Sequence, residues 1–591
     1  MKYICEFQKA SICILKLSIY MYIYSYSLFF TNNQVSLHLN IKISFMKKVS
    51  LFLLFCILCE IHVFACTNLL VGKKASVDGS TMITYSADSY ALYGELYHWP
   101  ARQWPKGSIM NVYEWDSGNF KYLGDIAQAQ QTYNVVGNIN EHQLTIAETT
   151  FGGRDELVDP EGKIDYGSLI YITLQRAKTA REAIKIMTDL VAEYGYNSGG
   201  ESFSIGDPNE IWVLEMSGKG KGNKGAVWVA VRIPDDCISA HANQARIQQF
   251  PLNDPENCLY SKDVISFAKE KGYYKGKDEN FSFAVAYNPL DFGGQRFCEA
   301  RVWSFFNRYN KDMAKFVTYA QGKTQDPMPL YIKPDRKLSL TDLQDMMRDH
   351  YEGTALDWTN DVGAGPFKSP YRWAPLTWES DSVKYCNERP IATQQSAFVF
   401  VTQMRSWLPN PIGGIIWFGT DDAAQTVFTP MYCSITEVPE CYREGNGDMY
   451  NFSWTSSFWI HNWVSNMVYN RYDSMHADLR KLQLELENKF LKEQDATEKE
   501  ALVLYNQSPE EAIQYLTTYS QKQAQYAFEK WKKLGEFLVV KYMDGGIKKE
   551  ENGVFTKGKL GEPIYPQRPG YSKEYYREVV KQTGDKYKVL Y

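Results

Sequence analysis

Positive charge is in short supply in this chain of 591 residues. Its 64 Lys and Arg face 69 Asp and Glu, which gives a net charge of -5. Proteins that bind nucleic acid usually carry an excess of Lys and Arg to neutralise phosphates, so the composition disfavours nucleic acid as a partner. Small molecules and peptides fit it better.

Metal and phosphate motifs are also missing. The sequence has no H-E-x-x-H, and no C-x-x-C pair follows residue 65, so nothing predicts a zinc site. The segment GKGKGNKG, residues 218–225, resembles a phosphate-binding loop in composition. Strand-like runs flank it on both sides and no helix follows, so we expect a hairpin loop there. We expect no metal and no cofactor.

The first 65 residues contain no uninterrupted apolar run long enough for a membrane span. Residues 46–65, MKKVSLFLLFCILCEIHVFA, have two lysines, an apolar stretch of about half the roughly 20 residues of a spanning helix, and small residues before a cut after Ala65. This pattern predicts a signal peptide, and hence export to a periplasmic or extracellular location with no stable membrane span in the mature chain. Residues 1–45 read as an upstream extension from a wrongly assigned start codon. A membrane helix over residues 11–30 is the alternative, and Lys16 interrupts it.

Cysteine is scarce after residue 65, and the number of cysteines there is odd. In an oxidising compartment six of these side chains could pair and leave one reactive thiol; alternatively, several are buried as small apolar groups. The seven are Cys66, Cys237, Cys258, Cys298, Cys386, Cys433 and Cys441.

Strand-like and helix-like segments alternate in blocks, which predicts an α+β fold. The Asp78-Gly79 pair predicts a hairpin at the start of the mature chain, and residues 133–153 predict a second hairpin that turns at 138–142. Two helices are expected over 166–194, the second opened by Thr179 and Glu182 as a capping box. Strands are then expected at 201–207, 210–216, 226–233 and 237–247, and charged helices after Tyr469.

A cut after Ala65 would place a thiol and a free α-amine on Cys66. Because an α-amine titrates near about 7.7 to 8.0 and a thiol near about 8.5, the amine can accept the thiol proton during attack on a carbonyl. One residue would then supply nucleophile and base. Two other interpretations stay open: Cys66 as the acylated cysteine of a lipoprotein, although Phe64 is bulky for that pattern, and Cys66 as a core thiol with the cut elsewhere.

The mature sequence resembles the dipeptidase A family of N-terminal-nucleophile cysteine peptidases. The resemblance rests on CTNLLVGKKASVDGSTMITYSADS, NVVGNINEHQLTIAETTFGGR, DYGSLIYITLQRAKTAREAI, SFSIGDPNEIWVLEM, HANQARI and QSAFVFVTQMRSWLPNPIGGIIWFG. Penicillin V acylases and bile salt hydrolases are more distant relatives with the same nucleophile. The resemblance implies a four-layer αββα sandwich over residues 66–470. Apolar positions at helix period predict residues 471–591 as a C-terminal helical extension that packs on it, with a partner-binding coil as the alternative.

The resemblance also implies a set of catalytic residues. Besides Cys66 it points to Asp88, to Asn243 as an oxyanion donor, and to Arg301 by local pattern. Asn243 and Arg301 each have an ordinary structural alternative. Asn243 can be a loop residue that caps its own backbone, and Arg301 can be half of an ion pair.

Three further residues are expected to bind substrate. Tyr85 stands where the acylase relatives have Arg, and Thr150 where they have a second Asn. Glu148 and Asp88 are the candidates for holding the free ammonium of a dipeptide, unless they are ordinary strand residues.

The expected function is therefore that of an exported cysteine dipeptidase acting on small peptides. An acylamide hydrolase of the penicillin V acylase or bile salt hydrolase type is one alternative, and a lipid-anchored binding protein without catalysis is another. Oligomeric state stays open, with a homo-oligomer among the outcomes.

Overall fold

The computed structural model describes residues 66–115, 121–372 and 376–591. The predicted extension 1–45 and signal peptide 46–65 lie outside the described residues, so both stay predictions. The described residues group into a single unit by their contacts. The boundary predicted between residues 470 and 471 likewise stays a prediction.

A seven-stranded antiparallel sheet carries the start of the described chain. The hairpin predicted around Asp78-Gly79 is confirmed: Leu70 of its first strand faces Ile83 of the second, and Gly79 takes a φ of +89°, which glycine adopts without strain. In spatial order the strands are β16 (Tyr331–Ile332), β14 (Ile238–His241), β1 (Asn68–Val71), β2 (Thr81–Asp88), β19 (Ser396–Met404), β20 (Ile415–Thr420) and β21 (Thr429–Tyr432).

A second, eight-stranded sheet contains most of the predicted central strands. Its spatial order is β15 (Cys258–Tyr260), β13 (Ala226–Ile233), β12 (Ile211–Gly218), β11 (Gly200–Gly206), β10 (Thr145–Gly152), β9 (Ile139–Asn140), β8 (Val135–Val136) and β3 (His98–Trp99). The hairpin predicted over 133–153 is thus three strands rather than two. The glycine-rich segment joins antiparallel β12 and β13, which confirms a hairpin loop. In the run 237–247 only β14 is a strand.

Two helices lie against the eight-stranded sheet, where the sequence predicts them. They are α3 (Tyr166–Leu174) and α4 (Ala180–Tyr194), which contact β10 to β13. Thr179 accepts a hydrogen bond from the Glu182 backbone at 3.2 Å, as a helix N-cap should. The capping box is only half formed, because the Glu182 carboxylate accepts from the Lys178 N–H instead, at 2.7 Å.

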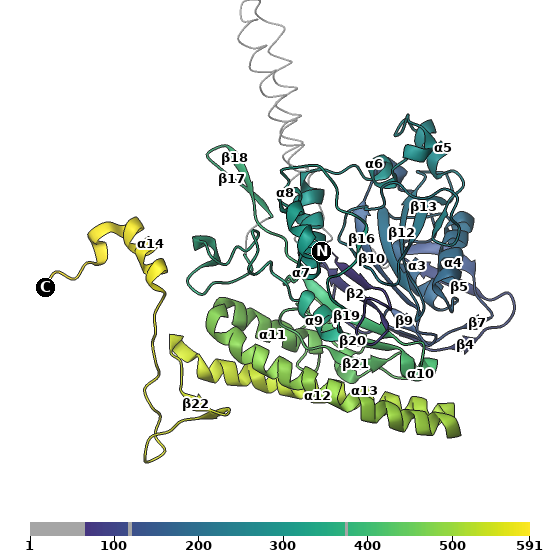
Figure 1. The fold of residues 1–591 in the computed structure, drawn as a ribbon. Helices are drawn as coiled ribbons and strands as arrows, with labels where there is room; N and C mark the ends of the chain where they lie inside the picture. Colours follow the sequence, from purple (N-terminus) through teal and green to yellow (C-terminus); the bar gives the residue numbers. More distant parts are fainter. Residues whose placement is uncertain (1–65, 116–120, 373–375) are drawn as a thin grey trace, which may run out of the picture. The chain divides into compact units, whose positions relative to one another are not determined.

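The two sheets contact each other, and each sheet also contacts helices. Strands β1 and β2 contact β10 and β11, and the seven-stranded sheet contacts α7 (Ala300–Tyr309), α9 (Leu340–Met346), α11 (Ser457–Asn470), α12 (Tyr472–Gln507) and α13 (Pro509–Lys541). The charged helices predicted after Tyr469 are therefore α12 and α13, which contact β21 (Figure 1). The protein is a mixed α and β structure with antiparallel sheets and C-terminal helices.

Shorter elements complete the chain. They are β4 (Arg102–Gln103), β5 (Ile109–Tyr113), β6 (Tyr122–Ala127), β7 (Gln131–Thr132), α5 (Val264–Glu270), α6 (Phe283–Tyr287), the π-helix η4 (Gly294–Glu299), α8 (Val317–Ala320), α10 (Asn410–Gly413), β17 (Thr377–Ser380), β18 (Val383–Cys386), β22 (Glu550–Glu551), β23 (Val554–Phe555) and α14 (Lys573–Thr583). Among the helices of the described residues, none has the length and apolar character needed to cross a membrane.

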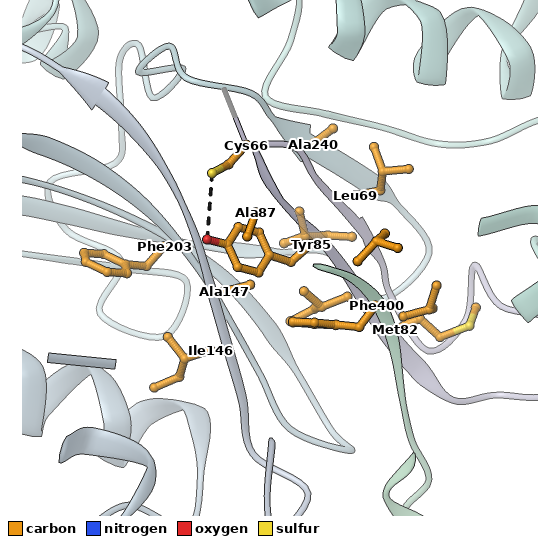
Figure 2. Packing of buried hydrophobic residues seen from close by; sticks show 14 of the residues in the cluster. Cys66, Leu69, Met82, Tyr85, Ala87, Ile146, Ala147, Phe203, Ala240 and Phe400 are labelled. Atoms are coloured by element: carbon orange, nitrogen blue, oxygen red, sulfur yellow. Dashed lines mark hydrogen bonds between the residues drawn. The ribbon is translucent and has the colours of Figure 1, made fainter. Parts of the chain in front are cut away.

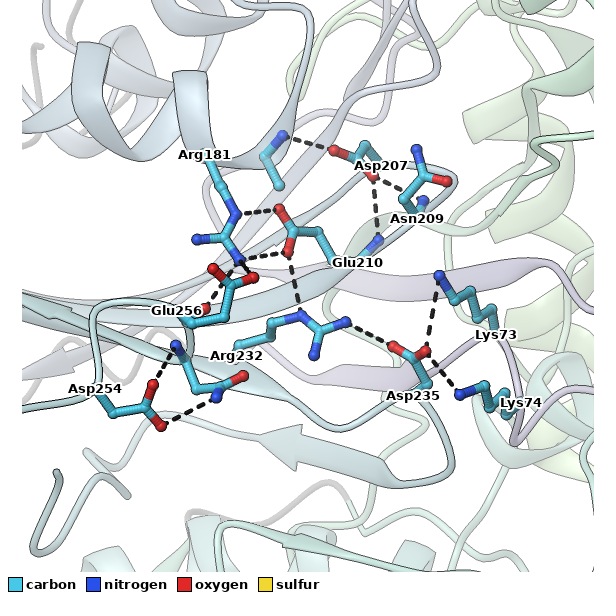
Figure 3. A network of polar contacts seen from close by, with 12 residues as sticks. Lys73, Lys74, Arg181, Asp207, Asn209, Glu210, Arg232, Asp235, Asp254 and Glu256 are labelled. Carbon is cyan, nitrogen blue, oxygen red and sulfur yellow. Dashed lines mark hydrogen bonds and ion pairs between the residues drawn. The ribbon is translucent and has the colours of Figure 1, made fainter.

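Ion pairs fix the turn between β11 and β12 (Figure 3). Glu210 accepts from both Arg181 and Arg232, at 2.9 and 3.1 Å, and Arg232 also donates to Asp235 at 2.7 Å. The seven cysteines of residues 66–591 are all free, so the interpretation with three disulfides is wrong and these side chains are thiols.

Candidate active site

Cys66 lies two residues before the start of β1 and beside β2, the strand that carries Tyr85 and Asp88. Its side chain is 6% exposed, and its sulfur donates to the Tyr85 hydroxyl at 3.7 Å (Figure 2). The Tyr85 ring packs edge-on against Phe398 and Phe400 of β19, with ring centroids 5.7 and 5.6 Å away. The strand pairing and these aromatic contacts therefore fix the hydroxyl next to the thiol.

Behind Tyr85 stands a pair of buried carboxyl groups. Tyr85 donates to Glu148 Oε1 at 2.5 Å, and Thr150, two residues further along β10, donates to Oε2 at 3.5 Å. Strand register places Glu201 of β11 directly opposite Thr150, and its carboxyl group lies close enough to that of Glu148 to lower the pKa of Glu148. Glu148 and Glu201 are 1% and 0% exposed. Burial raises the pKa of Glu148 above its ordinary value, against the hydrogen bonds that lower it.

The surroundings of Cys66 favour the protonated thiol. Burial raises the pKa of Cys66 well above its usual value, and the negative charges of Glu148 and Asp88 raise it further. Hydrogen-bonding contacts with the Asp88 backbone and the Tyr85 side chain lower it without offsetting those causes. With its nitrogen in a peptide bond, Cys66 is therefore a neutral thiol at pH 7.

Arg301 of α7 lies against the backbone of Cys66, as the resemblance implies, and all five of its N–H donors are in use. Nη1 donates to the Cys66 carbonyl at 2.5 Å and to Thr67 Oγ1 at 2.8 Å. Nη2 donates to the Ala242 carbonyl and to Asn243 Oδ1, both at 3.0 Å. Nε donates to the Phe297 carbonyl in the π-helix at 2.8 Å. A guanidinium has five N–H groups, so Arg301 positions the first strand and has none to spare for a ligand.

Asn243 links Arg301 to the strand that bears Glu148. Its φ of +65° lies in the left-handed region, where Asn is among the few favoured residues. Its amide nitrogen donates to the Thr150 carbonyl at 2.7 Å while its oxygen accepts from Arg301. Since a primary amide carries two hydrogens, one of them can still be donated to a ligand. Asn243 and Thr150 are half-buried, so this is the more open side of the site.

Asp88 faces a partner that the sequence did not reveal. Its Oδ2 accepts from Arg389 at 2.6 Å, and its Oδ1 accepts from Ser396 Oγ at 2.6 Å. Ser86 also donates to Oδ2, at 3.1 Å. Arg389 follows Asp88 by 301 residues, and no local pattern marks it. The Tyr85 departure therefore does not leave this site without a guanidinium; Arg389 supplies one to the carboxylate instead.

All seven predicted site residues lie in one connected group. A closed circuit of contacts runs from the Cys66 sulfur through Tyr85, Glu148, Thr150, Asn243 and Arg301 back to the Cys66 carbonyl. Asp88 joins through its backbone contact with the sulfur. Glu201, Arg389 and Ser396 were missed. A carboxylate inside the apolar run 201–207 was the one signal in the sequence for Glu201.

Within residues 66–115, 121–372 and 376–591, no group of three or more His, Cys, Asp or Glu side chains is arranged to hold a metal ion. What the site offers is a thiol, a hydroxyl that contacts it, a buried carboxyl pair, and an amide N–H on the more open side. These groups suit nucleophilic attack on a carbonyl carbon.

Comparison with known proteins places this geometry in a family. The chain is 26% identical over 443 residues to a "Probable dipeptidase" of Latilactobacillus sakei, an alignment that covers 71% of this chain and 84% of that protein. It is 27% identical over 398 residues to a "Probable dipeptidase" of Salmonella dublin, covering 63% and 81%. It is 26% identical over 416 residues to "Dipeptidase A" of Lactobacillus helveticus, covering 67% and 80%. The model of peptidase family C69 matches residues 65–485, so the chain belongs to this family, that of the dipeptidase A proteins.

Proposed function

We propose that this protein is an exported dipeptidase whose nucleophile is the sulfur of Cys66, made N-terminal by a cut after Ala65. The observation that carries the proposal is the circuit of contacts around Cys66, the first residue of the predicted mature chain. The relatives named as dipeptidases supply the substrate class. The contacts of the two sheets with each other, and of each sheet with helices, support a four-layer αββα N-terminal-nucleophile fold.

In the proposed reaction the Cys66 sulfur forms a bond to the peptide carbonyl carbon. The thiol proton passes to the residue's own α-amine, and then to the nitrogen of the leaving amino acid as its C–N bond breaks. Water attacks the resulting thioester, which releases the first amino acid and restores the thiol. The second amide hydrogen of Asn243 would stabilise the oxyanion in both steps.

The other predicted residues divide between positioning and substrate contact. Arg301 and Asp88 hold Cys66, since the bonds of both are directed at protein groups. Tyr85, Glu148 and Thr150 line the side on which the substrate would lie. Of the two carboxylates predicted to attract its ammonium, Glu148 is the better candidate, because Asp88 is already paired with Arg389.

The test uses the secreted protein and a panel of dipeptides with matched N-acetyl dipeptides. Terminal sequencing should begin at Cys66, and Cys66→Ala should fold normally yet lose dipeptide hydrolysis by at least about a hundredfold. Iodoacetamide should alkylate Cys66 faster than the other thiols and abolish hydrolysis. Normal turnover by Cys66→Ala, or a fatty acyl chain on Cys66, would refute the proposal. Preference for the N-acetyl compounds would favour an acylamide hydrolase instead.

A further inference from the structure

The buried carboxyl pair behind Tyr85 is more than the hydrolytic scheme requires. The proposed scheme uses the α-amine as base and one carboxylate, that of Glu148, to attract the substrate ammonium, yet Glu201 is almost fully buried beside it as well. Hydrogen bonds from Tyr85 and Thr150 offset part of the cost of burying Glu148, but a second carboxyl group beside it adds the cost of placing two like charges out of water. An arrangement so costly calls for a function.

Two neighbouring buried carboxyl groups cannot both be ionised easily. One proton shared between them removes the repulsion, so the resting pair carries one proton and one negative charge. Glu148 is the member that Tyr85 and Thr150 face with their hydroxyl groups, and both of these donate to it. The negative charge therefore lies on Glu148, next to Tyr85, with Glu201 as the protonated member of the pair behind it.

The hydrogen-bond directions align these groups as a proton path. The Cys66 thiol donates to the Tyr85 oxygen, and the Tyr85 hydroxyl donates to Glu148 Oε1 at 2.5 Å. Both donors point away from the sulfur and toward the carboxylate. A direct contact between the thiol and Glu148 runs beside this route, so removing the Tyr85 hydroxyl decides which of the two carries the proton. Shifting each proton by one bond turns the thiol into a thiolate without moving a heavy atom.

We propose that Tyr85 passes the Cys66 proton to Glu148, and that Glu201 is the positioning residue that keeps Glu148 ready to accept it. In this step the S–H bond breaks as an O–H bond forms on Tyr85, and the original Tyr85 proton bonds to Glu148 Oε1. The charge moves from the carboxylate to the sulfur, and the total charge is unchanged. The proton returns by the same path when water releases the acyl group from sulfur.

The electrostatics of the site assist such a transfer. The charge on Glu148 is one cause of the raised pKa of the Cys66 thiol, and this cause disappears once Glu148 is protonated. Burial raises the pKa of Glu148 and so makes it a stronger base. The other titratable groups that sense this charge are Tyr85 on β2 and Tyr171 on α3, whose pKa values are raised chiefly by burial. Both therefore stay neutral.

The path has a clear use if the proposed function, on which it rests, is right. An α-amine with a pKa of about 7.7 to 8.0 is mostly an ammonium at pH 7 and below, and an ammonium cannot accept the thiol proton. The Tyr85 path accepts it in that range and leaves the ammonium free to protonate the leaving nitrogen. It thus extends activity to lower pH.

Tyr85→Phe tests the path, because phenylalanine keeps the ring packing against β19 and removes only the hydroxyl. In the mature enzyme, kcat/KM for a dipeptide should then fall about tenfold per pH unit below about pH 7.8, where the α-amine becomes the sole acceptor. The wild type should keep its activity to distinctly lower pH. Tyr287→Phe is the matched control, since Tyr287 is equally buried and donates to the Val264 carbonyl at 2.6 Å, on a segment without contact to Cys66.

The role of Glu201 is tested by its effect on the acidic limb of the same pH profile, the range in which kcat/KM falls as pH is lowered. The neighbouring carboxyl group of Glu201 lowers the pKa of Glu148, so Glu201→Leu should raise that pKa and move this limb to higher pH. Glu201→Gln keeps an N–H donor and should restore the wild-type position. Glu210→Gln, at the β11–β12 turn (Figure 3), serves as control.

The proposal is overturned if kcat/KM of Tyr85→Phe and of the wild type fall over the same acidic pH range. It is also overturned if Tyr85→Phe has a higher KM and an unchanged kcat, because that result indicates a substrate contact alone. Failure of the proposed function is distinguishable, because then the wild type itself cleaves no dipeptide. The path is judged in that case by alkylation of Cys66 with iodoacetamide against pH. Removing the Tyr85 hydroxyl removes the route by which the thiol proton reaches Glu148, so Tyr85→Phe should be alkylated more slowly than the wild type in the acidic range, and equal rates refute the path.

Discussion

Replacing Arg301 with Met should cost both stability and activity, although this guanidinium has no donor left for a substrate. Methionine fills a similar volume and removes the charge, so the loss is that of the hydrogen bonds. Three of the five acceptors are backbone carbonyls, those of Cys66, Ala242 and Phe297. They lie in a region where Arg301 itself is 1% exposed, so water cannot easily replace the donor.

The magnitude follows from the number of carbonyl groups left without this donor. A buried acceptor that loses its partner costs about 1 to 3 kcal/mol, so three of them should lower the free energy of unfolding by at least about 3 kcal/mol. The carbonyl of Cys66 is also the atom that fixes the nucleophile. A shift of about 1 Å in a reacting group can cost about a hundredfold in rate, and we expect a loss of that order in kcat. Arg301→Lys should recover little, because an ammonium has three donors and no planar fork.

Urea unfolding of the mature protein measures the first effect, and dipeptide hydrolysis per folded molecule the second. Arg405→Met is a matched control: this arginine is 4% exposed and donates to the carbonyls of Ile412 and Gly413, near the opposite end of β19 from Ser396. It should lose stability and keep kcat. An Arg301→Met protein whose unfolding free energy and kcat both match the wild type would refute the positioning role.

Two further predictions concern buried charge. Arg389→Met should lower the free energy of unfolding by about 3 to 5 kcal/mol, because it leaves the Asp88 carboxylate buried with only hydroxyl partners. In a double-mutant cycle measured by urea unfolding, adding Asp88→Asn to this variant should recover part of the loss. Additive losses would count against the pair. His241 is buried between Thr149 and Ser204, and burial lowers its pKa to about 3. The unfolded chain therefore takes up a proton below about pH 6.5 that the folded chain refuses, so stability should fall by about 1.4 kcal/mol per pH unit from pH 6.5 toward pH 3, and His241→Gln should flatten that slope. An equal slope in the variant would contradict this.

Local patterns in the sequence predicted the elements whose cause is local. The Asp78-Gly79 turn, the Thr179 N-cap and the apolar face of α4 each depend on residues within a few positions of one another, so they can be read from the chain. The three strands over 135–152 were read as two, because a two-residue strand such as β9 leaves no periodic signal. The predicted capping box is only half present, because the Glu182 carboxylate accepts from the Lys178 backbone N–H instead of the Thr179 backbone N–H.

The candidate site divides along the same line. The resemblance pointed to residues that family motifs mark, and the fold brings all of them to Cys66. The sequence did not predict Arg389, because its partner Asp88 lies 301 residues earlier and only the pairing of β2 with β19 brings the two segments together. The sequence did not predict Glu201 as a site residue, because its place beside Glu148 depends on the register of β10 and β11, which sets it opposite Thr150. Contacts of this kind are properties of the sheet and leave no trace in spacing.

The charges around the sulfur explain why maturation matters in the proposed mechanism. Glu148 and Asp88 raise the pKa of the Cys66 thiol, while the two nearby guanidinium groups are directed elsewhere, Arg301 to five acceptors and Arg389 to Asp88. A cut after Ala65 would convert the neutral amide nitrogen of Cys66 into an ammonium on the same residue as the sulfur. At a separation of about 4 Å and an effective dielectric constant of about 20, that charge attracts a thiolate by about 4 kcal/mol, or about three pKa units. One bond cleavage would thus oppose the repulsion from the carboxylates, and the uncut chain would hold its nucleophile in an unreactive form.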